Sequence, residues 1–464
     1  MRVRVVMPMV LLAIVILAIA FSSGQAARAS DFVRRGDAYR DQYLYTAARD
    51  QYLQALDHRP GDPSLWLRLC QIEWRLARLS DASRSAERAE AAGAAPADVA
   101  ECRARIADSS GQPELAAEQW SIVAADRPGD RSARIRSIES LAAAHHWPAA
   151  TEAARSMVAQ LPDDPEASFF LGALLSLDEP AQARSVLRAS SLVEAKALSA
   201  VLTNPLGETD RAYRAVSVGR LFLDSGRLHL AWRAFVDAAS ANPAYPDAFA
   251  YLGITYAELG QPDLAEAHLD RALELDPRSA LGLYLRGLYL LHRTDWEDAR
   301  IDLARAAELE PSNAAVAVAL GQALAGQGQY VLAEEWLNRA TVVDPEAPAW
   351  QLALAEFYVG RLIHVDDKGV PVARRAVELA PESAAARDWL GWGLHLSGDP
   401  AQGEVELRVA LALDSTFARA RLHLGNLLVD TGRLEEGRTE LQRALDLDPL
   451  GEVGARAKQL LGIP

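Results

Sequence analysis

Cysteine and lysine are scarce in this sequence of 464 residues, and each shortage excludes a class of protein. The two cysteines, Cys70 and Cys102, are too few for a disulfide framework or a zinc site, although they could form one bridge. The only lysines are Lys196, Lys368 and Lys458, so nearly all basic residues are arginine. Because the formal net charge is −15, the chain lacks the clustered positive charge that neutralises phosphates, and we expect no nucleic acid partner.

Catalytic motifs are also missing. The sequence contains no Gly-x-Ser-x-Gly, no His-Glu-x-x-His, no Cys-x-x-Cys and no phosphate-binding loop. The adjacent pair His145-His146 could bind a metal, but a solvated turn between helices is the simpler interpretation, and Asp366-Asp367 has the same character. The remaining carboxylates are typical of helix caps and surfaces. We therefore expect no enzyme, no metal and no cofactor, with an unrecognised active site as the weakest alternative.

One long apolar segment stands at the start of the chain. Arg2 and Arg4 precede an uncharged run of 17 residues, Val5 to Phe21, which only Pro8 interrupts, and Ala27-Arg28-Ala29 follows. A positive start, an apolar stretch and an Ala-x-Ala ending are the parts of a secretory signal, while the length is also close to that of a membrane span. The pattern predicts that residues 1–29 are either a cleaved signal or a retained anchor. Both place the remaining chain outside the cytoplasm, in the periplasm, at the cell surface or secreted, with membrane contact only through the apolar run.

Proline marks an internal repeat in a chain otherwise rich in strong helix formers. Pro243, Pro277, Pro311 and Pro345 recur at intervals of 34 residues. Internal repeats are the first feature to establish, because they decide the whole fold. The stretch 246–279 shows the pattern best, in the residues Phe249, Leu252, Gly253, Tyr256, Gly260, Ala265, Leu269, Ala272 and Pro277.

This pattern predicts a helical hairpin. Leu252, Gly253 and Tyr256 are three or four residues apart, so they share one face of a first helix, and the residues from Ala265 onward do the same on a second. Gly253 and Ala265 are small, which lets the two helices approach closely. Gly260 breaks the chain between them, and the proline at the end of the repeat stops the second helix.

In these residues and intervals the chain resembles the tetratricopeptide repeat family. The register continues through 212–451, although Arg286 replaces an expected Leu and the repeat 348–383 is two residues longer. A more degenerate version runs through 30–189.

Two segments lie outside this register. Residues 190–211 fit no repeat and are expected to form a helix and an irregular joint between two solenoid halves. Residues 452–464 are expected to form a short C-terminal cap. The resemblance implies an all-α, right-handed α-solenoid of eleven or twelve hairpins. Together with residues 1–29, it is typical of an exported or membrane-anchored bacterial protein.

The resemblance also implies where partners bind. In this family the first helix of each hairpin lines a concave surface that holds peptides or protein segments. Carried over by position, the inward residues are Tyr213, Arg220, Asp224, Tyr284, His292, Gln322, Glu356, Trp392, His395, Asn426 and Asp430. These are aromatic and hydrogen-bonding side chains suited to gripping a chain, although ordinary exposed helix residues would look the same. Apolar or small residues interrupt the row, and a partner's apolar segment could lie there: Ala250, Ile254, Leu288, Val318 and Ala325.

Two functions follow from this organisation. The first is a non-enzymatic scaffold that binds protein or peptide partners outside the cytoplasm. The alternative is an accessory protein of polysaccharide or cell-envelope polymer export and assembly, in which Trp392, Trp389 and Tyr284 would stack on sugar rings.

Cys70 and Cys102 fall on first helices of consecutive repeats, which pack side by side in this family. Two interpretations remain open for them. They are either buried thiols acting as small apolar residues, or a disulfide formed under oxidising conditions.

Overall fold

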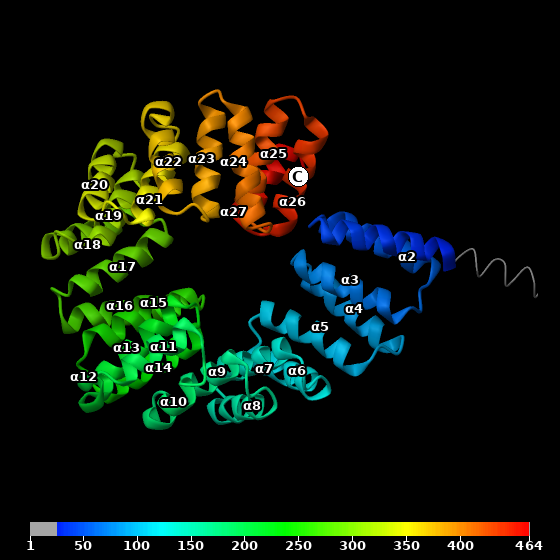
Figure 1. The fold of residues 1–464 in the computed structure, drawn as a ribbon, viewed down its shortest axis with the longest axis horizontal. Coiled ribbons are helices and arrows are strands. Elements are labelled where there is room, and N and C mark those ends of the chain that lie inside the picture. The colour runs from blue at the N-terminus through cyan, green and yellow to red at the C-terminus, as the bar shows by residue number, and fades with distance from the viewer. Residues whose placement is uncertain (1–25, 464) are drawn as a thin grey trace, which may run out of the picture. The chain divides into compact units, whose positions relative to one another are not determined.

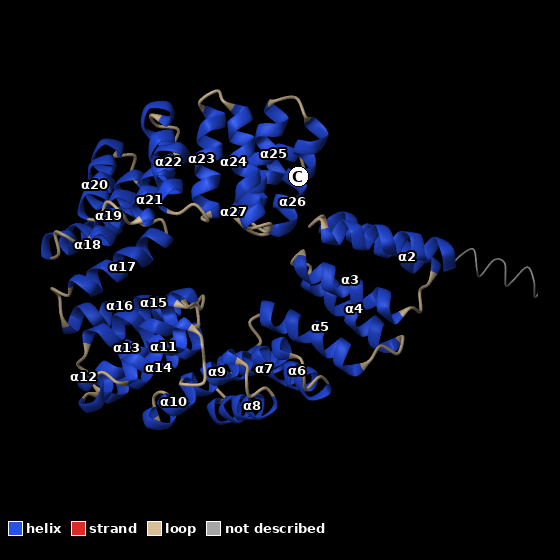
Figure 2. Ribbon diagram, in the orientation of Figure 1, coloured by secondary structure: helices blue, strands red, loops and turns tan. Residues whose placement is uncertain are grey.

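The computed structural model describes residues 26–463, and every regular element in this range is helical (Figures 1 and 2). The apolar run 5–21, expected to be a signal or an anchor, lies outside the described residues. Among the described helices, none combines the length and the apolarity that crossing a membrane requires. The all-α repeat fold expected from the sequence is confirmed.

The chain divides into two compact units, residues 1–126 with 404–464, and residues 127–403. In unit 1 a helix over residues 26–41 precedes α2 (Tyr45–His58), α3 (Pro63–Arg75), α4 (Leu79–Ala91), α5 (Pro96–Ser109) and α6 (Pro113–Asp126). The C-terminal part of unit 1 holds α25 (Ala418–Asp430), α26 (Leu434–Leu447) and α27 (Glu452–Leu461).

Unit 2 begins with α7 (Arg131–Ala143), α8 (Trp147–Gln160), α9 (Pro165–Leu175), α10 (Pro180–Leu187), α11 (Val193–Leu202) and α12 (Pro205–Thr209). It continues with α13 (Arg211–Asp224), α14 (Leu228–Ala241), α15 (Pro246–Glu258), α16 (Pro262–Leu275), α17 (Ala280–His292) and α18 (Trp296–Leu309). The remaining elements of unit 2 are α19 (Ala314–Gly326), α20 (Tyr330–Val343), α21 (Pro348–Gly360), the π-helix η1 (Val365–Gly369), α22 (Val370–Leu379) and α23 (Ala384–Leu396). Helix α24 (Pro400–Leu413) contains the boundary between the units.

Consecutive helices pair as hairpins, for example α13 with α14, α15 with α16 and α17 with α18. In the α15–α16 hairpin, a Cβ added at Gly253 would lie 2.6 Å from Leu269 Cγ and 3.0 Å from the Ala265 carbonyl oxygen. The small residue is therefore required for the close approach that the sequence predicted. Gly260 follows α15 with a φ of +70°, a conformation that favours glycine and ends the helix.

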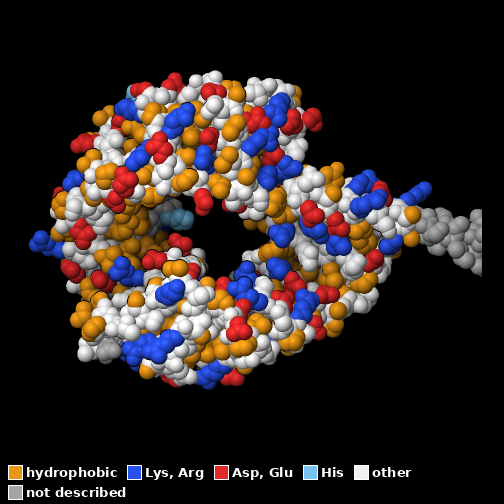
Figure 3. All heavy atoms as spheres, viewed as in Figure 1, with side chains coloured by type: hydrophobic (Ala, Val, Ile, Leu, Met, Phe, Trp, Pro, Cys, Tyr) orange, Lys and Arg blue, Asp and Glu red, His pale blue; other side chains and the backbone are white. Residues whose placement is uncertain are grey.

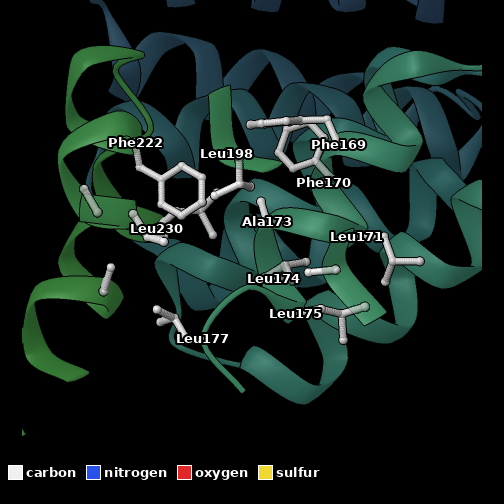
Figure 4. Packing of buried hydrophobic residues seen from close by; sticks show 14 of the residues in the cluster. Phe169, Phe170, Leu171, Ala173, Leu174, Leu175, Leu177, Leu198, Phe222 and Leu230 are labelled. Atoms are coloured by element: carbon white, nitrogen blue, oxygen red, sulfur yellow. The ribbon is translucent and has the colours of Figure 1, made fainter. Parts of the chain in front are cut away.

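The core of unit 2 is largest around α9, whose residues from Ala167 to Leu175 are all buried. A helix that is apolar on every side must be covered on every side. Figure 4 shows Phe169 of α9, Leu198 of α11 and Phe222 of α13 within this buried cluster.

The stretch 190–211 contains two helices, α11 and α12. Ala195, Leu198 and Leu202 of α11 are buried in the same cluster as α9 and α13, so α11 is part of the packed body of unit 2. The domain bounds expected from the sequence stay a prediction.

Some carboxylates are buried, which corrects the expectation that all of them lie at caps and surfaces. Asp302 is 3% exposed, and both of its oxygens accept hydrogen bonds from Arg286, at 2.6 and 2.9 Å. This ion pair explains the departure at position 286: the arginine that replaces the expected Leu carries its own buried partner on α18. Elsewhere, in the face shown in Figure 3, charged side chains of both signs are interspersed with apolar ones.

Candidate functional site: the first-helix face of unit 2

The first helices of successive hairpins contact one another in unit 2, in the order α13, α15, α17, α19, α21 and α23. The side chains that these helices do not use to pack against their second helices form one surface, called here the first-helix face. Each inward residue expected from the sequence lies on a first helix. Exposed among them are Arg220, Asp224, His292, Gln322, Glu356 and Asp430, while Tyr213, Tyr284, Trp392, His395 and Asn426 are half-buried.

Three of the expected residues surround one pocket. His292 of α17, Gln322 of α19 and Glu356 of α21 line a cavity of about 340 Å³, called here the α17–α21 pocket. Its apolar walls come from both first and second helices: Leu291, Trp296, Ala325, Leu337, Ala353 and Phe357. Arg361, directly after α21, completes the lining. An apolar cavity with a few convergent polar groups is the usual form of a binding site.

A small residue gives the pocket its aromatic wall. Trp296 is the first residue of α18, and a Cβ added at Gly326, the last residue of α19, would clash with the Trp296 ring. The indole therefore packs directly against the end of α19. Trp296 is absent from the inward set expected from the sequence, because it lies on a second helix.

The charges of this pocket are not neutralised internally. Over residues 26–463, neither Glu356 nor Arg361 takes part in an ion pair within 4.0 Å. A carboxylate and a guanidinium in the same pocket therefore remain available to groups on a ligand. With the His292 imidazole and the Gln322 amide, they provide hydrogen-bond donors and acceptors around an apolar centre.

The inserted turn of the 348–383 repeat lies next to Arg361. Leu362 and His364 adopt left-handed backbone conformations, with φ of 57° and 46°, before η1 begins. Lys368 and Tyr358 both donate to the Glu334 carboxylate, the tyrosine at 2.8 Å. The hydrogen bond from Lys368 lowers the pKa of Glu334, so this carboxylate stays ionised and ties the insertion to α20.

A second pocket contains two more expected residues. Arg220 and Asp224 of α13 line a cavity of about 580 Å³ with Val193, Glu194, Ala197 and Val201 of α11. The Arg220 guanidinium carbon lies 5.6 Å from the centre of the Tyr251 ring, which orients the arginine along the first-helix face. Helix α11, to which the repeat pattern assigned no role, forms one wall of this α11–α13 pocket.

The other expected residues line neither pocket. Trp392 and His395 contact each other on α23, with ring centres 5.1 Å apart. Asn426 and Asp430 lie on α25 of unit 1. Trp389 is 7% exposed and belongs to a buried cluster, so the expectation that it stacks on a sugar ring is wrong. It lies three residues before Trp392 and faces Gly360, whose added Cβ would be 3.2 Å from the indole.

One member of the histidine pair, His145, is part of an aromatic stack. The His145 ring lies parallel to the Trp232 ring at 4.1 Å and to the Trp147 ring at 5.9 Å. Within the described part of the chain, no group of three or more His, Cys, Asp or Glu side chains is arranged to hold a metal ion.

Both cysteines are buried free thiols, Cys70 on α3 and Cys102 on α5, two helices in contact. The two thiols belong to one buried cluster, and the neighbouring Cys102 thiol together with burial raises the pKa of Cys70. The sequence-based expectation that the two lie close together is therefore confirmed.

Comparison with known proteins identifies similar sequences and folds. Sequence profiles described as tetratricopeptide repeat match residues 219–280, 252–308, 290–357 and 394–461. Cellulose synthase operon protein C of Xanthomonas axonopodis pv. citri (strain 306) is 24% identical over 454 residues, which cover 92% of this chain. The chain spans only 28% of the length of that relative.

Among solved structures, yeast Tom70 has a TM-score of 0.43 at 17% identity, covering 94% of this chain and 96% of its own. A tetratricopeptide repeat protein from Parabacteroides merdae has a TM-score of 0.45 at 16% identity, covering 54% of this chain and 97% of its own.

Proposed function

Since the chain belongs to the tetratricopeptide repeat family, we propose that it is a non-enzymatic scaffold whose first-helix face binds extended segments of partner proteins. The observation that carries this proposal is the α17–α21 pocket, where three successive first helices contribute polar side chains around one apolar cavity. A single helix could not assemble such a pocket, so the repeat fold itself creates it.

The pocket defines the kind of segment that fits. A large apolar or aromatic side chain is expected to fill the space between Trp296, Leu337 and Phe357, because such anchors dominate the energetics of protein interfaces. Glu356 and Arg361 are expected to pair with flanking groups of opposite charge on the segment, which adds specificity and sets its direction.

Action outside the cytoplasm is part of the proposal. Its support is the sequence pattern of residues 1–29, a positive start followed by an apolar run. The partners are then proteins of the cell envelope or its surroundings.

A matched pair of charge reversals tests the binding site. Glu356→Arg reverses a pocket charge on α21, and Glu335→Arg makes the same change at an exposed position of α20 outside the pocket. Full-length protein carrying either change is used to capture partners from a membrane extract, and captured proteins are quantified against the wild type. We expect Glu356→Arg to lose specific partners at least tenfold and Glu335→Arg to retain them. Equal capture by both variants would exclude this pocket as the binding site.

The similarity to cellulose synthase operon protein C favours a second candidate, a role in polymer export or assembly. Affinity electrophoresis through gels containing soluble β-glucan distinguishes the two functions. Retardation of the protein supports direct polymer handling, whereas unaltered migration together with partner capture supports the scaffold.

A further inference from the structure

The two terminal parts of unit 1 contact each other directly. The turn that precedes α2 lies against α26, although the contacting residues are 400 positions apart (Figure 1). The Thr46 backbone N–H donates to Asp446 Oδ2 at 2.8 Å, and the Thr46 hydroxyl donates to Asp446 Oδ1 at 2.8 Å. Asp446 is only 1% exposed, so this contact is a buried one.

Asp446 acts as the missing N-cap of α2. The first backbone N–H groups of a helix need acceptors, and a side chain just before the helix usually supplies one. In α3 and α7 the preceding Asp62 and Asp130 do so. Leu44, the residue before α2, has no side-chain acceptor. The carboxylate therefore comes from α26, where the positive end of the α2 dipole also favours a negative charge.

Further contacts surround this cap. The Arg443 Nε donates to the Gln42 carbonyl oxygen at 2.9 Å, and the hydroxyls of Tyr43 and Ser415 are 2.7 Å apart. The Arg421 guanidinium carbon lies 5.2 Å from the centre of the Tyr43 ring. These contacts combine a helix cap, hydrogen bonds and a cation–π pair, as specific interfaces do.

The same region also contains an apolar contact. Leu447, the last residue of α26, packs against the buried cluster that includes Tyr45 and Tyr52 of α2. Residues 42–46 together with Ser415, Arg421, Arg443, Asp446 and Leu447 are called here the end contact.

We propose that the end contact is a head-to-tail interface that a second copy of this chain can complete. Every copy carries both halves, the uncapped start of α2 and the Asp446 side of α26. The two halves are far apart along the chain, because the polypeptide that joins residues 42–46 to Ser415 passes through all the intervening repeats. Exchanging such identical contacts between copies is a low-cost route to association.

The balance between the two forms depends on concentration. Within one chain, the intervening repeats set the effective concentration of one half near the other, and that concentration is independent of the protein concentration. Between chains, contact formation rises with protein concentration. Because the two halves differ, the interface is heterologous and can add copies in one direction.

Cross-linking between two marked chains tests the proposal. In a background with Cys70→Ala and Cys102→Ala, one chain carries Gln42→Cys and a second chain, of different tag size, carries Arg443→Cys. Asp446 and Thr46 stay intact in both. A short bis-maleimide is expected to link the two chains to each other, with a yield that rises with protein concentration. A chain with both new cysteines that links only internally, while the mixed chains never link, would overturn the proposal. Absence of any link in either arrangement would overturn it as well.

Loss of the contact should lower the yield of the link between chains. Asp446→Ala removes the trans cap, and Asp57→Ala, an equal charge change at an exposed position of α2, is the control. If Asp446→Ala lowers the helical circular dichroism, Tyr43→Gly replaces it. Tyr43 has a φ of 60°, which glycine adopts freely, so this variant removes the ring and hydroxyl without straining the turn. We expect inter-chain yield to fall at least fivefold in the contact variants and to stay unchanged in the control. Undiminished yield in the contact variants would refute the assignment of the interface.

Discussion

Substituting Gly253 by alanine tests whether the close approach of α15 and α16 limits stability. The added methyl would lie 2.6 Å from Leu269 Cγ and 3.0 Å from both the Ala265 carbonyl oxygen and the Leu269 backbone nitrogen. Two of these neighbours are backbone atoms, so the helices themselves must move apart. Overpacking of this kind costs about 1–3 kcal/mol, while alanine in a helix interior returns about 1 kcal/mol relative to glycine. We therefore expect a net loss near 1 kcal/mol.

Gly393→Ala is the matched control on α23. There the added methyl would meet Val359 Cγ2 and Val370 Cγ2, both at 3.3 Å, and these side-chain methyl groups can shift by a few tenths of an ångström. The helix-propensity gain then decides the outcome, and stability should stay level or rise by up to about 1 kcal/mol. Gly253→Leu should lower the stability more than Gly253→Ala, because its longer side chain meets the same backbone atoms.

Denaturant unfolding and hydrogen exchange provide the measurement. In a repeat protein each hairpin depends mainly on its neighbours, so exchange in Gly253→Ala should accelerate in α13–α18 and stay unchanged in α3–α6. Equal stability of Gly253→Ala and Gly393→Ala would refute the packing argument. Acceleration spread evenly over the chain would refute the local character of the repeats.

Three further predictions concern other parts of the chain. A fusion of residues 1–35 to a reporter that is active only outside the cytoplasm should be active, and a silent but expressed fusion would refute export. Thiol titration of the denatured, unreduced protein should find two free thiols, Cys70 and Cys102, and a count of zero would show a bridge instead. Glu73 is buried, and this burial raises its pKa above the ordinary value near 4.5. Between the unfolded-state pKa and the raised folded-state pKa, the folded state holds a proton on Glu73 that the unfolded state has lost. Glu73 therefore lowers the stability of the folded state as the pH rises through this interval. Glu73→Gln should remove this contribution, and an unchanged pH profile of unfolding would contradict it.

The hairpin fold could be predicted because its determinants are local and periodic. Gly253, Ala265 and Leu269 recur in register with their counterparts in other repeats, since each hairpin solves the same packing problem. The segment 190–211 broke this period and was expected to hold one helix and an irregular joint. Helix α11 forms there, because Ala195, Leu198 and Leu202 bury one apolar face against α9 and α13.

The site was predictable only in part. Position within the repeat placed His292, Gln322 and Glu356 on first helices, and the structure brings all three to one pocket. The same rule could not find Trp296, because its role depends on the absence of a side chain at Gly326, thirty residues further along the chain. Arg361 stands at the start of the inserted turn, where the chain leaves the repeat register, so no repeat position described it.

Trp389 shows the limit of residue type as a guide. Trp389 stands next to Leu390, which occupies the repeat register, and one helical residue turns a side chain by about 100°. From the sequence alone, the indole could face either the partner or the neighbouring hairpin. The small residue at Gly360 decides the outcome, because it opens space for the indole inside the protein. Sugar binding by this side chain is thereby excluded. Of the two tryptophans of α23, Trp392 is the one that remains on the first-helix face.

The role of Asp446 also could not be predicted from residue type. On sequence grounds it is one more acidic residue near the end of a second helix, where a carboxylate is disfavoured by the helix dipole. Its burial becomes understandable only when the start of α2, which lacks its own cap, supplies the Thr46 donors. A carboxylate at the wrong end of its own helix and a helix start without an acceptor are two local anomalies that compensate each other. Each could be noticed alone from the sequence, and their pairing requires the three-dimensional fold.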